Sequence, residues 1–574
     1  MRHQSLSIIL ALLLTAALTG CDSSSLSDGS AGGNALTSNP PTSEPDPDEH
    51  TYAVADASPS PGSHDEGAMA SESDIAGPMD PNLPPSSPSE GDKYEDVGAN
   101  PFTVVSHDPQ STFGIDVDTA SYDLFRRDTG NYGWLPHEAG VRLEEYVNNF
   151  DYDYQAPASD SEVPFEVSVE AAASPYRDVV LMRVGIRGQE APEEDKKPAN
   201  VVFLVDVSGS MSSNLKLPLV KTVLKETVTM LEPTDTISIV TYAGQVGVRL
   251  EPTPASEVAV IFDAIETMKS GGGTSGAAGL TLAYEQAEAA FIDGGINHIV
   301  LCSDGDFNIG PSSDEALVEL IEEKRESGIT MTVLGFGSGN LNDSMMEKVS
   351  NAGNGVYGVI ANQDHAISYV QNKLLSTLFF IAKDVKIQVD FNAEQVLAYR
   401  LLGYENRAIA DHLFEDDTVD AGEIGAGHTV TALYELVLNG EAIPQAPGMP
   451  EVDDGEAFDG ELEFESNELC LVKIRYKNPE DGVDDPSMAL SQAVIEKQIA
   501  DHIEATSGDF QFAAAVSGLA EHLRLSPFAL PGDFEHIRSL AEQNVDGKAD
   551  REEFIWLLDV AEPMLIEEPS LITP

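Results

Sequence analysis

The sequence is poor in basic residues. Lys and Arg together number 31 against 98 Asp and Glu, which gives a formal net charge of −67 over 574 residues. A surface this acidic repels the phosphate backbone of nucleic acids and the headgroups of anionic lipids. We therefore expect no nucleic-acid partner.

Cysteine is also scarce. Cys21, Cys302 and Cys470 lie far apart in the chain and form no CxxC pair. This spacing argues against a zinc finger, a redox dithiol and a disulfide framework.

The motifs of the common enzyme classes are missing from the sequence. We find no nucleophile elbow, Walker A motif, dinucleotide-binding GxGxxG or HExxH with the residues that each requires. The glycine loop Gly271–Gly276 lacks the lysine of a phosphate cradle, and the histidines are scattered without metal-ligand spacing. We predict that the protein is not an enzyme.

The N-terminus has the features of an export signal. Arg2 and His3 precede an apolar run from Leu6 to Leu18, which is shorter than the roughly 20 residues of a membrane span and suits a signal-peptide core. The run ends in Leu-Thr-Gly-Cys, which resembles the lipobox of bacterial lipoproteins. This resemblance implies a signal peptide over residues 1–20 and lipidation of Cys21; the alternative is an ordinary secretory signal.

Residues 21–101 are predicted to form a disordered tether. Residues 22–100 hold 15 Ser, 11 Pro and 16 acidic residues against one Lys. Such a segment cannot bury enough apolar surface to offset its ordering entropy. We expect a lipid-anchored protein on the periplasmic side of the cell envelope, with inner or outer membrane left open.

The remaining chain is long enough for several domains, at roughly 150 residues each. Residues 198–380 alternate apolar β-branched runs with amphipathic helices, which predicts an α/β domain with a mostly parallel sheet. The short gap Ala243–Gln245 predicts a hairpin and one antiparallel edge strand. The flanks, residues 102–197 and 381–574, read as α+β or β-rich; in the second, we expect helices over Pro486–Thr506 and Phe510–Arg524.

Five oxygen-bearing residues stand where strands of the α/β domain end. Asp206, Ser208 and Ser210 form a DxSxS turn after the first strand, Thr274 follows three glycines, and Asp304 ends a later strand. The carboxyl ends of strands in such sheets form the ligand-binding crevice. We expect all five side chains to converge there.

These five residues resemble the metal-ion-dependent adhesion site of von Willebrand factor type A domains. The resemblance implies a Rossmann-like, doubly wound fold in which Ser208, Ser210 and Thr274 coordinate the ion directly or through water, while Asp206 and Asp304 act mainly through water. Hard oxygen ligands favour Mg²⁺, with Mn²⁺ or Ca²⁺ possible. A partner's Asp or Glu would complete the shell. The alternative is that the five residues only cap helices and form turns.

The flanks resemble those of bacterial YfbK-type A-domain lipoproteins. The resemblance rests on Ser111–Tyr122, Val141–Glu145, Gly403–Arg407 and Asp420–Glu435, and it covers residues 102 to about 571. Because the role of that family is poorly defined, the resemblance bears on architecture more than on biology.

Two other acidic patterns imitate metal sites. Asp116 and Asp118 lack the DxSxS spacing, so a structural role is favoured for them. Glu542–Glu553 places oxygen-bearing residues at EF-hand positions, but it begins with Glu and has Ala549 where an aliphatic residue is expected.

Together these features predict an exported, lipid-anchored A-domain protein that mediates metal-dependent protein–protein interaction or scaffolding in the cell envelope. The alternatives are a metal-assisted hydrolase or enzyme accessory subunit, and a metal-free structural protein of the envelope.

Overall fold

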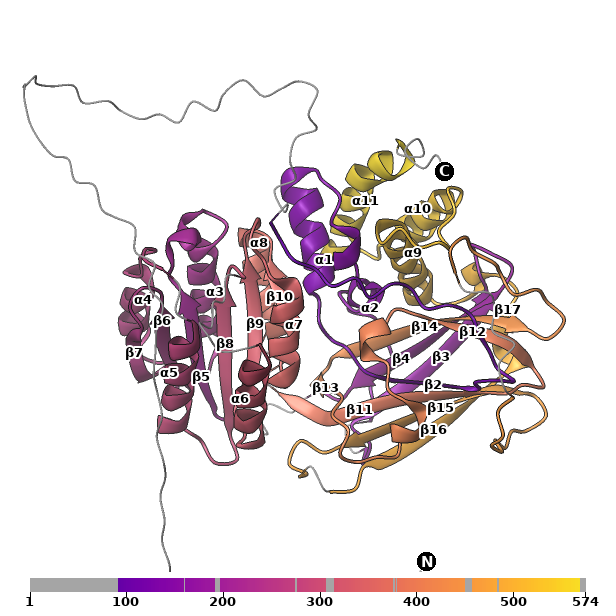
Figure 1. Ribbon diagram of the computed structural model, residues 1–574, viewed down its shortest axis with the longest axis horizontal. Coiled ribbons are helices and arrows are strands. Elements are labelled where there is room, and N and C mark those ends of the chain that lie inside the picture. Colours follow the sequence, from indigo (N-terminus) through magenta and orange to yellow (C-terminus); the bar gives the residue numbers. More distant parts are fainter. Residues whose placement is uncertain are drawn as a thin grey trace, which may run out of the picture. The chain divides into compact units, whose positions relative to one another are not determined.

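The computed structural model describes residues 91–158, 161–190, 197–273, 276–305, 314–374, 377, 379–449, 457–482 and 485–567. These residues belong to one unit of the chain, which spans Asn82–Pro574. A mostly parallel sheet, two largely antiparallel sheets and a cluster of C-terminal helices are its main parts (Figure 1).

The central domain contains a six-stranded sheet. Its strand order is β10-β9-β8-β5-β6-β7, and every pair is parallel except β6 and β7. The doubly wound α/β prediction and its antiparallel edge strand are therefore confirmed. The strands are β5 (Ala199–Asp206), β6 (Thr236–Tyr242), β7 (Gly247–Pro254), β8 (Ile296–Ser303), β9 (Thr330–Phe336) and β10 (Tyr357–Ile360).

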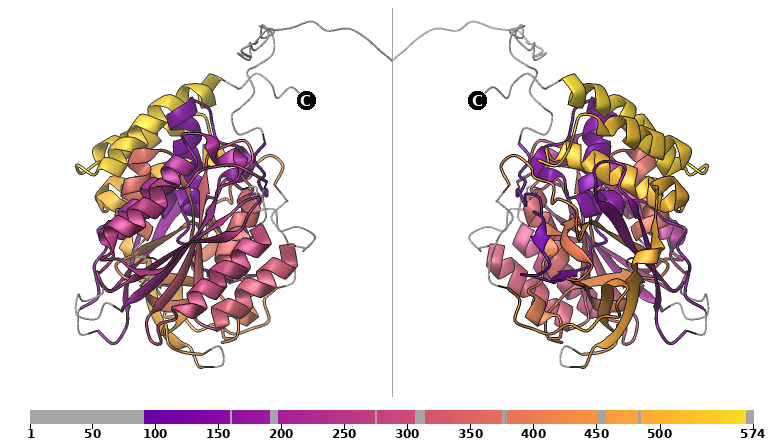
Figure 2. Two further views of the ribbon diagram at one scale, coloured as in Figure 1. Left: turned by 90° about the vertical axis from the view of Figure 1, so that its left-hand side faces the viewer. Right: turned by 90° about the vertical axis from the view of Figure 1, so that its right-hand side faces the viewer.

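Helices cover both faces of this sheet (Figure 2). Alternate residues of β5 enter different cores: Val201 and Phe203 pack with α3, α4 and α8, while Val202 and Leu204 pack with α5, α6 and α7. Burial on both faces explains why the strand is apolar without interruption from Val201 to Val205. The helices are α3 (Leu217–Met230), α4 (Val258–Glu266), α5 (Gly276–Ala289), α6 (Asp314–Glu326), α7 (Asp343–Ala352) and α8 (Gln363–Tyr369), which the π-turn η5 (Val370–Leu374) extends.

The two flanks build their sheets together. One sheet has the order β1-β12-β14-β4-β3-β17, so strands that precede and strands that follow the central domain are interleaved in it. The other sheet has the order β13-β11-β15-β16, with β2 paired to β11. A shared apolar core joins the two sheets. The strands are β1 (Thr103–Val104), β2 (Gln110–Gly114), β3 (Phe165–Ala173), β4 (Val180–Gly188), β11 (Phe380–Phe391), β12 (Val396–Leu402), β13 (Gly422–Gly425), β14 (Thr429–Leu438), β15 (Glu468–Lys477), β16 (Met488–Ile495) and β17 (Ile499–Ala500).

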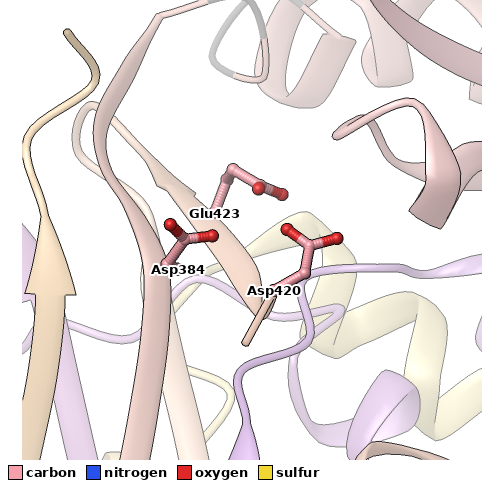
Figure 3. A group of neighbouring side chains, drawn as sticks. All are labelled: Asp384, Asp420 and Glu423. Carbon is pink, nitrogen blue, oxygen red and sulfur yellow. The ribbon is translucent and has the colours of Figure 1, made fainter. Parts of the chain in front are cut away.

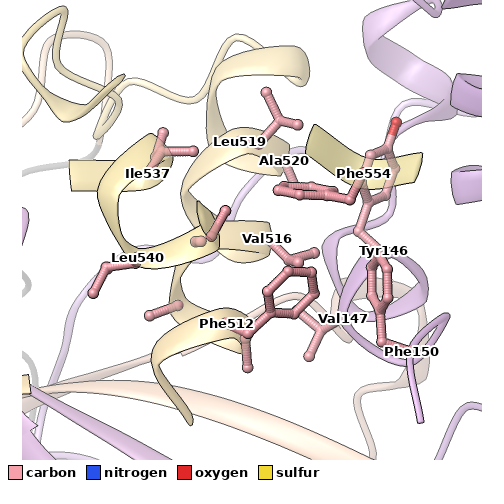
Figure 4. Close-up of a cluster of buried hydrophobic side chains, with 14 of the residues drawn as sticks. Tyr146, Val147, Phe150, Phe512, Val516, Leu519, Ala520, Ile537, Leu540 and Phe554 are labelled. Atoms are coloured by element: carbon pink, nitrogen blue, oxygen red, sulfur yellow. The ribbon is translucent and has the colours of Figure 1, made fainter. Parts of the chain in front are cut away.

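Helices from both flanks also pack together (Figures 1 and 2). Phe150 from the N-terminal flank contacts the rings of Phe512 and Phe554 at centroid distances of 5.0 and 5.8 Å (Figure 4). No helix within the described part of the chain is both long and apolar enough to cross a membrane. The helices are α1 (Ala120–Phe125), extended by the π-helix η1 (Arg126–Tyr132), α2 (Leu143–Val147), α9 (Gly508–Leu523), α10 (Asp533–Gln543) and α11 (Ala549–Glu567).

The helix predicted over Pro486–Thr506 is wrong. The segment contains strand β16, which pairs antiparallel with β15, the short strand β17, and two single-turn 3-10 helices, but no α-helix. Met488, Leu490 and Val494 face the core shared by the two sheets, which is the period of a strand. The helical propensity of this Ala- and Gln-containing segment is overridden because β15 offers a free edge.

Residues 91–101, which the sequence assigns to the tether, pack against the central domain and the flanks. The backbone N–H of Lys93 donates to Leu341 O at 2.7 Å, and the Asp92 carboxylate pairs with Arg127 at 2.8 Å. Asn100 Nδ2 donates to the carbonyls of Leu401 and Gly403. The folded part therefore begins before Phe102.

Candidate functional site

The DxSxS turn forms the centre of the site. Asp206 is the last residue of β5, and its Oδ1 accepts a hydrogen bond from the backbone N–H of Ser208 at 2.7 Å. The turn continues into the 3-10 helix η4 (Gly209–Ser212), and the Oγ atoms of Ser208 and Ser210 lie 2.8 Å apart. Asp206 and Ser208 are buried, while Ser210 is exposed. The turn thus offers a carboxylate and two hydroxyls at the carboxyl end of the central strand.

A glycine loop lies against this turn. Gly209 N donates to Gly272 O at 3.1 Å, and Gly271 N donates to Val207 O at 2.7 Å. Gly272 has a φ of +90°, and a Cβ there would lie 3.0 Å from the backbone N of Gly244. Both features require glycine. Thr274 follows this loop and, like Cys21, lies outside the described residues.

Asp304 directly follows β8, the strand next to β5, and is buried. Its Oδ2 accepts a hydrogen bond from Lys216 Nζ at 2.9 Å, and the same ammonium donates to Asn340 Oδ1 at 2.9 Å. Burial raises the pKa of Asp304, but hydrogen bonds from Lys216 and Ser210 outweigh it, so the pKa lies below its usual value. Asp304 is therefore ionised at neutral pH.

Lys216 is the residue of this site that sequence reasoning missed. Its ammonium joins the loops after β8 and β9, and its side chain is 9% exposed. The adhesion-site pattern contains no lysine, so the motif could not indicate it. The sequence offers one indirect signal: Lys216 directly precedes the apolar residues that begin α3, and most of these residues are buried.

The four described residues fit a small divalent cation. Mg²⁺ binds oxygen at about 2.1 Å in an octahedral arrangement, which places adjacent ligands roughly 3 Å apart. The two serine hydroxyls have this spacing, at 2.8 Å. Asp206 and Asp304 supply negative charge beside them, and the Lys216 ammonium compensates part of it. Hydroxyl and carboxylate oxygens are the hard ligands that such an ion prefers.

Asp116 and Asp118 have the structural role that the sequence favours. Asp116 Oδ2 and Asp118 Oδ2 accept hydrogen bonds from Arg407 at 3.1 and 3.2 Å. Asp118 Oδ1 also accepts from the backbone N–H of Tyr357 at 2.7 Å. Both carboxylates thus link the two flanks, and that of Asp118 also reaches the central domain.

The EF-hand-like segment directs its side chains to separate partners. Glu553 pairs with Arg126 at 2.9 Å, Glu542 pairs with Arg538 at 3.3 Å, and α11 already begins at Ala549. A calcium-binding loop instead turns these positions toward one point. The structure therefore gives no support to an EF-hand.

Three family profiles match consecutive parts of the chain. The von Willebrand factor type A domain matches residues 200–373, and a profile described as von Willebrand factor matches residues 88–182. A third, described as the C-terminal part of uncharacterized protein YfbK, matches residues 376–564.

Proteins similar to this chain share different amounts of its length. Uncharacterized protein YfbK from Escherichia coli is 36% identical over 480 residues, which are 82% of this chain and 81% of the E. coli protein. Uncharacterized protein sll0103 from Synechocystis is 26% identical over 186 residues, which are 32% of this chain and 43% of that protein. A von Willebrand factor type A structure from Catenulispora acidiphila, 15% identical, covers 70% of this chain and 91% of its own, with a TM-score of 0.39.

Proposed function

Because the chain belongs to the YfbK family of von Willebrand factor type A domain proteins, we propose that its A domain, residues 198–380, binds Mg²⁺ and uses the ion to capture an acidic side chain of a protein partner. Mn²⁺ or Ca²⁺ could take the same place. The family relative is itself uncharacterised, so the proposal rests on the site.

One observation carries the proposal. The hydroxyls of Ser208 and Ser210 lie 2.8 Å apart beside two buried carboxylates at the carboxyl edge of a parallel sheet. Helix capping alone would not require this arrangement, because the Ser208 side chain accepts no capping hydrogen bond from a backbone N–H of η4. The grouping of hydroxyls and carboxylates at one edge is what a cation site needs.

Each residue has a distinct part in the proposed site. Ser208, Ser210 and Thr274 would hold the ion, and Asp206 and Asp304 would act mainly through water. When bound, the ion supplies a positive charge that attracts a carboxylate. Lys216 holds Asp304 in place and shares its charge, so the protein's own ligands leave the cation electrophilic. Ser210 is exposed, which gives a partner access to this side.

The charge of the whole chain makes a cation useful for recognition. A protein with a net charge of −67 repels acidic partners. A partner's carboxylate can therefore dock only where the surface is locally positive. Surface repulsion is screened beyond roughly 8 Å at physiological salt, whereas an ion in a partly desolvated crevice acts at contact distance. Binding should therefore persist at moderate ionic strength.

We further propose that Cys21 is lipidated and holds the A domain to the cell envelope through an acidic tether. The support is the Leu-Thr-Gly-Cys sequence after the apolar run. A Cys21→Ser chain should lose a metabolic fatty-acid label and leave the membrane fraction, because stable attachment needs the multiple acyl chains of a lipoprotein. A variant that keeps the label and stays with the membrane would contradict the anchor.

Partner capture is tested by crosslinking and pull-down from membranes, with and without EDTA. We expect a partner that is recovered with Mg²⁺, lost with EDTA and lost with Thr274→Ala. The matched control is Thr281→Ala, an exposed threonine on α5, which should capture as the wild type does.

The same experiment separates the alternatives. Capture that is untouched by EDTA and by Thr274→Ala would place the interface outside the A-domain site. Hydrolysis of the captured partner on addition of Mg²⁺ would favour the metal-assisted hydrolase.

A further inference from the structure

A second group of oxygen ligands lies outside the A-domain site. The carboxylates of Asp384, Asp420 and Glu423, which we call the acidic triad, point toward one another (Figure 3). One oxygen from each lies within 4.8 Å of the others. Asp384 is on β11 and Glu423 is on β13, two neighbouring strands of one sheet, and Asp420 lies just before β13. All three residues are far in sequence from Asp206.

Strand register explains how the triad is assembled. β11 pairs antiparallel with β13, and the register shifts between Ala382 and Val385, so that Asp384 sits at a bulge with a φ of +52°. Val385 pairs with Gly422, the neighbour of Glu423. A bulge re-aims a side chain that regular pleating would place on the other face. Asp384 and Glu423 thereby come together across the two strands.

The charges of the triad are only partly compensated. Arg325 of α6 pairs with Asp420 at 2.5 Å, and Lys477 of β15 lies 3.3 Å from Asp384 Oδ2. Both cations are also held elsewhere, Arg325 by Asn354 Oδ1 at 2.9 Å and Lys477 by the carbonyl of Asp417 at 2.5 Å. They balance two of the three carboxylates.

Glu423 forms no ion pair at contact distance with another described residue, although the more distant Arg325 and Arg407 lower its pKa in part. It is 9% exposed, and its Oε1 has no hydrogen-bond partner among the residues that the structure describes. Burial, followed by the charges of Asp420 and Asp384, raises the pKa of Glu423 well above its usual range. A buried carboxylate without a partner is costly, and it either keeps a proton or takes a cation.

Space for an ion lies beside Glu423. A cavity of about 110 Å³ is lined by two members of the triad, Glu423 and Asp420, and by Arg407, whereas Asp384 does not line it. A water molecule takes roughly 30 Å³ in the liquid, so the cavity can hold a cation with some of its water shell.

We propose that the acidic triad binds one divalent cation of the calcium type. Ca²⁺ accepts six to eight oxygen ligands at about 2.3–2.6 Å in flexible geometry, so two oxygens on one ion lie at most about 5 Å apart, which accommodates the spacing of the triad. Three carboxylates opposed by two fixed cations make a weak site, with a Kd on the order of 10⁻⁴–10⁻³ M, the range of extracellular calcium modules. Since Arg325 belongs to the A domain, the ion would stabilise the contact between this domain and the sheet. The proposal does not depend on the A-domain metal.

Calorimetric titration of Ca²⁺ into the full chain tests the site. The Asp206→Ala variant is used, so that a cation in the A-domain site does not contribute. We expect one Ca²⁺ per chain and a rise in Tm of about 1–2 °C at ten times the Kd. Glu423→Gln in the same background should weaken binding at least tenfold.

The variant is expected to fold, because Gln keeps the shape of Glu423 and removes an uncompensated charge. Its Tm without Ca²⁺ should equal or exceed that of its parent. Glu394→Gln, at an exposed position of the same flank, is the matched control and should bind as the parent does. Unchanged affinity in Glu423→Gln would overturn the assignment, and so would no binding at several millimolar Ca²⁺, which would mean that the triad holds a proton.

Discussion

Arg407→Met should destabilise the protein by about 3–5 kcal/mol, the cost of leaving buried carboxylates without their cation. Arg407 donates to Asp116 and Asp118 and lies 3.9 Å from Glu347, while its own side chain is 15% exposed. Met fills a similar volume without the charge. Chemical denaturation monitored by circular dichroism measures the loss.

The size of this effect follows from where the three acids come from. Asp116 and Asp118 belong to the N-terminal flank, Glu347 to α7 of the A domain and Arg407 to the C-terminal flank. Burial, followed by the charge of Asp116, raises the pKa of Asp118 well above its usual value even with Arg407 present. Without the guanidinium, the acids of the N-terminal flank and of the A domain would repel one another, and the C-terminal flank would lose its ion pairs to both.

Lowering the pH should rescue Arg407→Met in part. An acid whose pKa is raised on folding costs stability when ionised, and that cost disappears as the pH falls through the folded pKa. The difference from wild type should therefore shrink between pH 7.5 and 5.5. Lys225→Met, which removes a surface ion pair with the fully exposed Glu266, should change the stability little at any of these pH values. A loss of this small size in Arg407→Met, or one independent of pH, would contradict the account.

Asp206→Ala should abolish the stabilisation of the protein by Mg²⁺. An ion that binds only the folded state adds about 2.7 kcal/mol at one hundred times its Kd. The Asp206 carboxylate is buried beside the two serine hydroxyls and accepts a hydrogen bond from the backbone N–H of Ser208. Its loss removes both a negative charge near the ion and the bond that fixes the turn. Thermal unfolding over a range of Mg²⁺ concentrations, in the Glu423→Gln background to silence the acidic triad, measures this effect.

Lys216→Met is the matched comparison. Unlike Asp206→Ala, it should preserve or increase the stabilisation that Mg²⁺ provides. Without its ammonium, Asp304 loses a buried partner, so the protein free of Mg²⁺ should be less stable by about 3 kcal/mol. The increment due to Mg²⁺ should equal or exceed that of wild type, because no ammonium then competes with the ion for Asp304. An Asp206→Ala protein that gains as much from Mg²⁺ as wild type does would show that the site is assigned wrongly.

The parts of the fold that could be predicted from sequence are those in which local pattern and tertiary role agree. The strands of the central sheet could be predicted as short, largely apolar runs between helices, because most of them are buried on both faces. β16 could not be predicted in this way: its composition suits a helix, and only pairing with β15 makes it a strand. The mixing of strands from both flanks in one sheet is likewise a long-range property that periodicity does not contain.

The same distinction holds for the sites. Asp206, Ser208 and Ser210 form a local motif at a strand end, and their grouping follows from topology. Lys216 and the acidic triad carry no motif. Asp384 reaches Glu423 through a bulge and strand pairing between residues far apart in the chain, which a single sequence does not disclose.

The claim that the A domain binds a cation is tested most directly by a crystal structure of the protein grown with Mn²⁺, in which anomalous scattering locates the ion. We predict a peak beside the Oγ atoms of Ser208 and Ser210, in reach of Asp206, Asp304 and Thr274, and absent from crystals of Asp206→Ala. A peak at the acidic triad would bear on the second site alone. Wild-type crystals with no peak at the serine pair, at a Mn²⁺ concentration of several millimolar, would contradict the account.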